Sequence, residues 1–163
     1  MTKAIVPGSF DPMTLGHLWL IERAARDFDE VIVAVMINDS KHYLFDMQTR
    51  VEIARQTVSD LPNFRVISDR GMLIDLFDRL DADAVCKGWR NTRDLAYENE
   101  MAAWNHAHNP RFCTKLYQSD GVHQTLSSTE VRDLLSQGNS IEATVHPNAL
   151  PLIRQALAEQ GGN

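Results

Sequence analysis

The chain has 163 residues, 44% of them hydrophobic, and a formal net charge of −6 at pH 7. That length allows one sizeable hydrophobic core and is short for two, so we expect a single domain. The acidic balance and the lack of a long run of lysine or arginine argue against nucleic acid as a general partner.

Five apolar runs of strand length, rich in β-branched residues, recur along the chain. They span residues 3–6, 31–37, 64–68, 83–88 and 113–118. The other segments have helical spacing, at 18–28, about 46–59, 72–80, 94–106, 128–137 and 148–159. In the first of these, Leu18, Ile21, Ala25 and Phe28 recur every three or four positions, which predicts an amphipathic helix.

This alternation of strands and helices predicts an α/β fold, with a single doubly wound, Rossmann-like parallel sheet covered by helices on both faces. No repeat or linker marks a domain boundary, so we expect one domain over residues 1–159 and a disordered tail at 160–163. In open parallel sheets the ligand crevice lies beyond the carboxyl ends of the strands, where the strand order reverses. The residues just after each strand are therefore the first candidates for a site.

The two cysteines, Cys86 and Cys113, lie in apolar runs predicted to be buried strands. This setting favours reduced thiols in a cytoplasmic protein over a disulfide framework. The amino terminus lacks the charged-then-apolar pattern of a signal peptide, and no apolar segment is long enough to span a bilayer. We therefore expect a soluble cytoplasmic protein with no membrane partner.

The segment PGSFDPMTLGH follows the first predicted strand. Gly8 allows close approach of the backbone, Pro7 and Pro12 stiffen the turn, and Gly16 and His17 open the next helix. Backbone N–H groups and a helix dipole then converge on one point, an arrangement that attracts phosphate. A Gly-His pair alone, however, is more often an ordinary helix cap with an exposed or core histidine.

The full segment resembles the signature of the nucleotidyltransferase superfamily, G-[ST]-F-D-P-x-T-x-G-H, and every fixed position matches from Gly8 to His17. A second element, LSSTEVRDLL at 126–135, resembles I-S-S-[ST]-x-[VI]-R of the same superfamily. By itself, this second element would be an N-cap box followed by a solvated arginine. The resemblance implies that residues 14–17 hold nucleotide phosphates, together with Ser127, Ser128, Thr129 and Arg132.

Between these ends the chain resembles one family, the bacterial phosphopantetheine adenylyltransferases, over nearly its whole length. The stretches that carry the resemblance are NDSKHYLFDMQTRVEIA after the second strand and KGWRNTRDLAYENEMAAWN after the fourth. The resemblance implies that Lys41, otherwise a surface lysine, binds the reacting phosphates. It implies that Arg90 clamps the β and γ phosphates of the nucleotide and that Glu98 contacts the adenosine region. Tyr97 and Met101 fit the apolar stripe of the predicted helix and are expected to pack it.

The chain departs from the family pattern at Lys87, where arginine is usual, and at Ala96, which replaces a glutamate. Lysine at 87 turns a bidentate contact into a point charge, so we expect an effect on substrate affinity more than on reaction type. The family's apolar pantetheine slot implies contacts from Met72, Leu73 and Asn105, which equally fit a core role.

The resemblance implies transfer of AMP from ATP to 4′-phosphopantetheine, giving dephospho-coenzyme A and pyrophosphate. The implied catalytic residues are His17, Lys41 and Arg90. The implied ATP-binding residues are Ser9, Phe10, His17, Gly88, Arg90, Glu98, Ser127, Ser128, Thr129 and Arg132. The implied phosphopantetheine-binding residues are Ser9, Lys41, Met72, Leu73, Lys87 and Asn105. Mg²⁺ is expected on the nucleotide phosphates, with few protein ligands and no need for a cage of carboxylates. A homohexamer and feedback inhibition by coenzyme A are likewise implied.

Two alternatives stay open. One is another nucleotidyltransferase, with nicotinamide mononucleotide or an alcohol phosphate as acceptor, although cytidylyltransferases typically carry R-T-x-G-I-S-T-[ST] where this chain has HQTLSSTEVR. The other is a non-catalytic nucleotide or coenzyme A sensor, which only the lysine at 87 supports. The remaining histidines are expected to face solvent or to cap helices: His42, His106, His108, His123 and His146.

Overall fold

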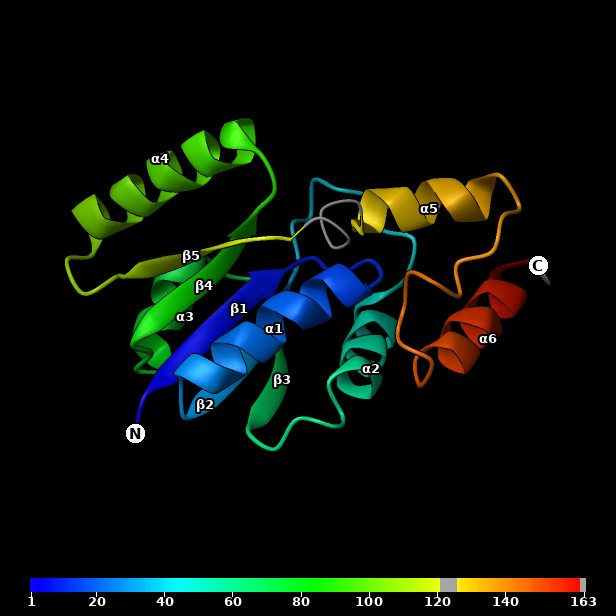
Figure 1. Cartoon of the computed structure of the whole chain (residues 1–163), viewed down its shortest axis with the longest axis horizontal. Coiled ribbons are helices and arrows are strands. Elements are labelled where there is room, and N and C mark those ends of the chain that lie inside the picture. The colour runs from blue at the N-terminus through cyan, green and yellow to red at the C-terminus, as the bar shows by residue number, and fades with distance from the viewer. Residues whose placement is uncertain (121–125, 162–163) are drawn as a thin grey trace.

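The computed structural model describes residues 1–120 and 126–161 and has one five-stranded parallel sheet at its centre. The strands are β1 Lys3–Gly8, β2 Glu30–Met36, β3 Phe64–Asp69, β4 Ala84–Trp89 and β5 Thr114–Gln118. Their order in the sheet is β3-β2-β1-β4-β5 (Figure 1). The predicted α/β fold with a parallel sheet is confirmed, and each strand lies within three residues of its predicted bounds.

Six helices accompany the sheet within the described ranges. They are α1 Leu15–Asp27, α2 Met47–Thr57, α3 Leu73–Arg79, α4 Thr92–His108, α5 Ser128–Ser136 and α6 Leu150–Gly161. Helix α1 begins three residues before its predicted start, because the Thr14 side chain accepts from two backbone N–H groups and caps it there. Pro151 lies in the first turn of α6, where its missing N–H costs no helical hydrogen bond.

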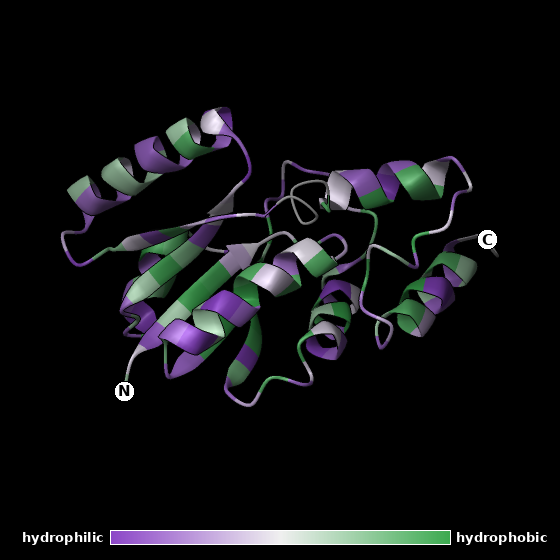
Figure 2. Cartoon of the chain, viewed as in Figure 1, coloured by the Kyte–Doolittle hydropathy of each residue, from purple (hydrophilic) through white to green (hydrophobic). Residues whose placement is uncertain are grey.

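The two faces of the sheet bury two separate cores. Along β1, Ala4 and Val6 pack into a cluster with α1, α2, α5 and α6, while Ile5 packs into a second cluster with α3. Successive side chains of a strand point to opposite faces, so this split is the expected result of covering both. Figure 2 shows hydrophobic residues along the strands and hydrophilic ones on the outward face of α1. The doubly wound arrangement is therefore confirmed.

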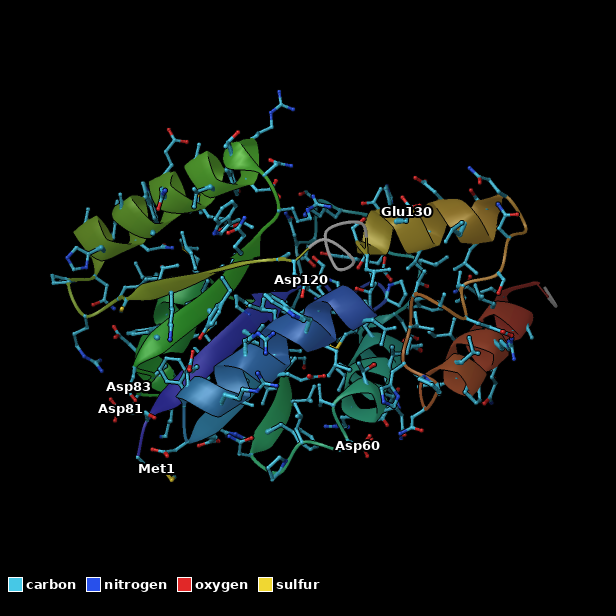
Figure 3. The ribbon with its side chains drawn as sticks, viewed as in Figure 1. Met1, Asp60, Asp81, Asp83, Asp120 and Glu130 are labelled. Atoms are coloured by element: carbon cyan, nitrogen blue, oxygen red, sulfur yellow. The ribbon has the colours of Figure 1, made fainter. Side chains whose placement is uncertain are left out.

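The strand order reverses between β1 and β4. Strand β1 pairs with β2 on one side and with β4 on the other, so the carboxyl ends of β1 and β4 lie side by side. In Figure 3, Asp120 and Glu130 lie on this side of the sheet, whereas Asp81 and Asp83 lie at the opposite end. The turn after β1 and the start of α5 thus share one edge of the molecule.

Three details of the sequence prediction are wrong. Helix α6 continues through Gly161, past the predicted start of the tail at 160, and the Gln160 side chain donates to the Leu44 carbonyl at 2.7 Å. Cys86 is buried as predicted, but Cys113 is exposed, because it precedes the edge strand β5. The apolar residues of α4 do not all pack inward either, since the side chains of Tyr97 and Met101 are exposed.

Candidate active site

The turn between β1 and α1 is shaped by Gly8 and Phe10. The Phe10 ring lies so close that a Cβ at position 8 would sit 2.8 Å from its Cζ atom, which only glycine avoids. Phe10 has a φ of 48°, and its buried ring meets the His17 ring edge-on at a centroid distance of 5.0 Å. The Phe10 ring therefore packs against His17 and supports it.

His17 is the third residue of α1, and its ring closes a capping box. The Thr14 backbone N–H donates to His17 Nδ1 at 3.0 Å, while the Thr14 hydroxyl donates to the Leu126 carbonyl at 2.6 Å. Nδ1 therefore accepts a hydrogen bond and carries no proton. In the neutral ring the proton is then on Nε2, which is free to donate outward from the helix start.

The electrostatic setting of His17 keeps it neutral. Burial, and to a lesser extent the nearby positive charge of Arg90, together lower its pKa from the ordinary 6.5 to about 4. At neutral pH the site thus presents a neutral imidazole donor whose tautomer is fixed by the Thr14 N–H.

Helix α5 is docked on this turn by hydrogen bonds across more than a hundred residues of sequence. Ser128 Oγ donates to the Pro12 carbonyl and Arg132 Nη1 to the Asp11 carbonyl, each at 2.7 Å. Together with the bond from Thr14 to Leu126, these contacts place the start of α5 beside the start of α1. The two sequence elements that resemble the nucleotidyltransferase signature therefore form one structural unit.

Two clefts meet at His17. The first, of about 260 Å³, contains five of the predicted site residues: His17, Lys87, Gly88, Arg90 and Ser127. The second, of about 300 Å³, contains seven: Ser9, Phe10, His17, Lys41, Ser128, Thr129 and Arg132. We name these the Lys87 cleft and the Lys41 cleft. Because His17 lines both, a ligand spanning the two clefts passes its side chain.

Each cleft carries two basic side chains with different partners. In the Lys87 cleft, Lys87 Nζ lies 3.6 Å from a Glu98 carboxylate oxygen, and Arg90 Nε donates to Asp94 at 3.1 Å. Glu98 thus lies against Lys87. In the Lys41 cleft, Arg132 Nη2 donates to Thr129 at 3.1 Å, and the Lys41 side chain is exposed. The clefts therefore present cations along a short path, which suits a polyphosphate.

A third hollow, of about 530 Å³, lies between α3 and α4 and joins three further predicted residues: Met72, Leu73 and Asn105. Of the predicted site residues, Glu98 alone lines none of these three cavities. Its other walls are mostly apolar, formed by Ile74, Glu100, Met101 and Trp104. Asn105 is 8% exposed, so its amide is a polar group set into an apolar wall. We name this hollow the Asn105 slot.

The carboxylate in the wall of the Lys41 cleft belongs to Asp11, and both of its oxygens accept hydrogen bonds from the backbone. Its two oxygens accept from the Leu44 N–H at 2.7 Å and the Phe45 N–H at 2.9 Å.

Across residues 1–120 and 126–161, no group of three histidine, cysteine or acidic side chains is arranged to hold a metal ion. A divalent cation here would bind through phosphate oxygens and water, the set that Mg²⁺ prefers at nucleotide sites.

Comparison with known proteins agrees with this geometry. A family model described as cytidylyltransferase-like matches residues 5–134. A phosphopantetheine adenylyltransferase from Limosilactobacillus reuteri is 39% identical over 160 residues, covering 98% of this chain and 92% of the relative. Another, from Symbiobacterium thermophilum, is 40% identical over 159 residues and 98% of each chain. The chain belongs to the phosphopantetheine adenylyltransferase family.

A solved structure supports the fold independently. A protein from Vibrio parahaemolyticus, provisionally described as a nicotinate-nucleotide adenylyltransferase, superimposes with a TM-score of 0.74 over 95% of this chain and 93% of its own. At 20% identity this likeness concerns the fold alone. Within the described residues no helix is long and apolar enough to cross a membrane.

Sequence reasoning missed two residues whose side chains hold the walls of the Lys41 cleft together, Asp11 and Arg50. Asp11 was visible as a fixed position of the first motif, but its partners Leu44 and Phe45 lie more than thirty residues away. Arg50 lies in α2 at a position typical of a surface residue, yet it is 1% exposed.

The predicted solvent-facing role of His42 is incomplete, because this exposed side chain also lines the Lys41 cleft. His123 lies outside the described residues.

The lowered pKa of His17 predicts a dependence of stability on pH. Between about pH 6.5 and pH 4 the unfolded chain binds a proton at His17 and the folded chain does not. The contribution of the neutral His17 to the free energy of unfolding is therefore complete above pH 6.5 and is lost as the pH falls toward 4. Relative to His17→Gln, which cannot titrate, wild type should lose up to about 3 kcal/mol of unfolding free energy over this range. Urea denaturation at a series of pH values measures it; parallel pH curves for the two proteins would contradict the pKa assignment.

Proposed function

We propose that the chain transfers the adenylyl group of ATP to 4′-phosphopantetheine, giving dephospho-coenzyme A and pyrophosphate. The observation that carries the proposal is the neutral His17 donor at the junction of two cationic clefts, in a chain similar to phosphopantetheine adenylyltransferases over nearly its whole length. The nucleotide would span both clefts past His17, and the acceptor phosphate would bind beside Lys41 and Ser9 in the Lys41 cleft. We propose that the whole chain acts as one domain, because α5 and α6 pack into the same core as the sheet.

The proposed reaction needs no activated side-chain nucleophile. An oxygen of the acceptor phosphate forms a bond to the α-phosphorus of ATP, and the bond from that phosphorus to the α–β bridging oxygen breaks. Pyrophosphate leaves with the electron pair. The protein then has to align the two phosphates and to neutralise the charge that builds up on the phosphorus oxygens.

The site residues divide between these tasks. His17 Nε2–H would donate to the α-phosphate as it becomes pentacoordinate, since the Thr14 N–H leaves that proton on the outward nitrogen. Lys41 would bridge the α-phosphate and the attacking phosphate, and Ser9 would hold the latter. The departing pyrophosphate would be held by Arg90, Ser127, Ser128, Thr129 and Arg132.

Mg²⁺ would be carried by the nucleotide phosphates and would supply further neutralisation of their charge. The basic and hydroxyl side chains around His17 fit such a complex, because they offer donors to phosphate oxygens and leave the cation to phosphate and water. The adenosine would occupy the Lys87 cleft beside Gly88, with Glu98 acting through Lys87.

The pantetheine arm would extend from the Lys41 cleft into the Asn105 slot. Its amide groups suit the Asn105 side chain, and its methyl and methylene groups suit Met72 and Leu73. This use of the slot explains why a buried amide is set among apolar side chains.

Lys87→Arg should tighten the binding of ATP or phosphopantetheine. Lysine offers a point charge, already 3.6 Å from Glu98, whereas arginine can pair with Glu98 or a phosphate through two parallel N–H groups. Titration calorimetry with each ligand measures the change, expected at about tenfold. Unchanged affinity for both ligands would mean that a neighbouring side chain compensates for the lysine.

We also propose a homohexamer, feedback inhibition by coenzyme A and a cytoplasmic location. The exposed apolar side chain of Tyr97 on α4, which lies outside the lining of the Asn105 slot, supports a subunit interface along this helix. Coenzyme A contains the adenylylated product, so the same clefts suit it. The free thiols of Cys86 and Cys113 agree with a reducing compartment.

The test of the proposed function is a pyrophosphate-release assay. ATP and CTP are each combined with phosphopantetheine, nicotinamide mononucleotide and an alcohol phosphate, with Mg²⁺ present. We expect release only with ATP and phosphopantetheine. Release with another pair would assign a different transferase activity, and ATP binding without any release would contradict catalysis.

A further inference from the structure

Arg50, in the first turn of α2, is a fully buried arginine next to the proposed acceptor site. Its Nη1 donates to the Ser9 carbonyl at 2.8 Å and to the Met36 carbonyl at 3.4 Å, and its Nε donates to the Phe45 carbonyl at 3.1 Å. Its guanidinium carbon also lies 3.9 Å from the centroid of the Tyr43 ring. Burial lowers the pKa of Arg50, and the Asp11 carboxylate opposes that change.

These contacts converge on the segment that carries Lys41, residues 37–46. Met36 ends β2 at one end of the segment, Phe45 lies at the other, and Tyr43 lies between them. The Tyr43 hydroxyl accepts from the Asn38 N–H at 2.9 Å and so closes the segment on itself. One guanidinium therefore contacts both ends and the middle of this segment.

The same guanidinium also reaches the turn after β1, through Ser9. Ser9 and Lys41 are more than thirty residues apart in sequence, and both line the Lys41 cleft. Asp11 adds a second link between the same two segments, since its carboxylate accepts from Leu44 and Phe45. The spacing between Ser9 and Lys41 thus depends on a small set of buried polar contacts centred on Arg50.

We propose that Arg50 is a positioning residue for the acceptor phosphate: it fixes the Lys41 segment against the Ser9 turn and so sets the width of the cleft between them. This inference rests on the proposed function for the identity of the acceptor. A planar guanidinium is suited to the task, because it donates to several carbonyls in one plane while its face packs on an aromatic ring.

The experiment compares Arg50→Gln with Arg55→Gln. Arg55 lies five residues further along α2, is half-exposed and pairs with Glu52, so it controls for replacing an arginine of this helix. Steady-state kinetics should give a KM for phosphopantetheine raised at least tenfold in Arg50→Gln, with the KM for ATP changed less than threefold. Arg55→Gln should match wild type in both constants.

A second readout does not depend on activity. Lys41 is exposed, so endoproteinase Lys-C can cut after it, and cutting requires the segment to leave its packed conformation. The fragment that ends at Lys41 should form at least fivefold faster in Arg50→Gln than in wild type or Arg55→Gln. If Arg50→Gln does not fold, Tyr43→Leu removes the ring beneath the guanidinium and is expected to shift both readouts in the same direction.

The KM values and the rate of cutting at Lys41 together decide the proposal. Unchanged phosphopantetheine KM and unchanged cutting at Lys41 would overturn the proposal. Equal loss of affinity for ATP and phosphopantetheine, in step with a lower Tm, would also overturn it, because Arg50 would then serve stability alone. If wild type and Arg55→Gln release no pyrophosphate with phosphopantetheine, the proposed function fails, and the rate of cutting at Lys41 alone decides whether Arg50 positions the segment.

Discussion

Replacing His17 with alanine should lower kcat by about a hundredfold or more while the KM for ATP changes little. The neutral ring donates one hydrogen bond to a phosphate whose charge builds up only as the bond to the acceptor forms. An interaction that strengthens in the transition state contributes to kcat rather than to ground-state binding. A pyrophosphate-release assay at saturating phosphopantetheine with varied ATP measures both constants.

Two controls separate a catalytic effect of His17→Ala from an effect on folding. His106→Ala removes a histidine whose Nδ1 faces the Phe112 carbonyl, outside both clefts, and should leave kcat near the wild-type value. The loss in His17→Ala should persist at temperatures well below its Tm, since the variant also removes half of the capping box at the start of α1. Near-normal turnover of His17→Ala would remove His17 from the mechanism.

The order of elements, and the gathering of the candidate residues at one edge of the sheet, were predictable from the sequence because both follow from local patterns. The alternation of apolar strands and amphipathic helices requires a parallel sheet covered on both faces, and such a sheet opens at the carboxyl ends of its strands. Gly8 and Thr14 lie in one short motif whose turn and cap are formed by neighbouring residues. The predicted site residues other than Glu98 accordingly line the two clefts at His17 or the Asn105 slot.

The contacts that fix the site were not predictable, because they join distant segments. Nothing near Arg50 in sequence indicates that its guanidinium meets the Ser9 carbonyl, and a charged helical residue is ordinarily placed in solvent. The pairing of Lys87 with Glu98 depends in the same way on how α4 lies over β4. Helical spacing alone likewise could not predict that the side chains of Tyr97 and Met101 are exposed. An apolar stripe shows which residues share one face of a helix, but not whether another part of the chain packs against that face.

The Lys41 side chain provides the second large predicted effect. Lys41→Ala should lower kcat/KM for phosphopantetheine by about a hundredfold or more, because the cation would neutralise both the attacking phosphate and the α-phosphate. Lys41→Arg keeps the charge but replaces a compact ammonium with a planar fork, so its activity should fall between those of wild type and alanine. The constants are measured by varying phosphopantetheine at saturating ATP.

This prediction can be separated from any effect on folding. The Lys41 side chain is exposed, so its truncation should change the free energy of unfolding by less than about 0.5 kcal/mol. Lys115→Ala is a matched control, since Lys115 lies on the edge strand β5, outside the clefts, and pairs with Asp27 at the end of α1. Its loss should leave kcat/KM unchanged. A Lys41→Ala variant with wild-type kcat/KM would mean that other groups of the Lys41 cleft, Ser9 and Arg132 foremost, align the two phosphates without it.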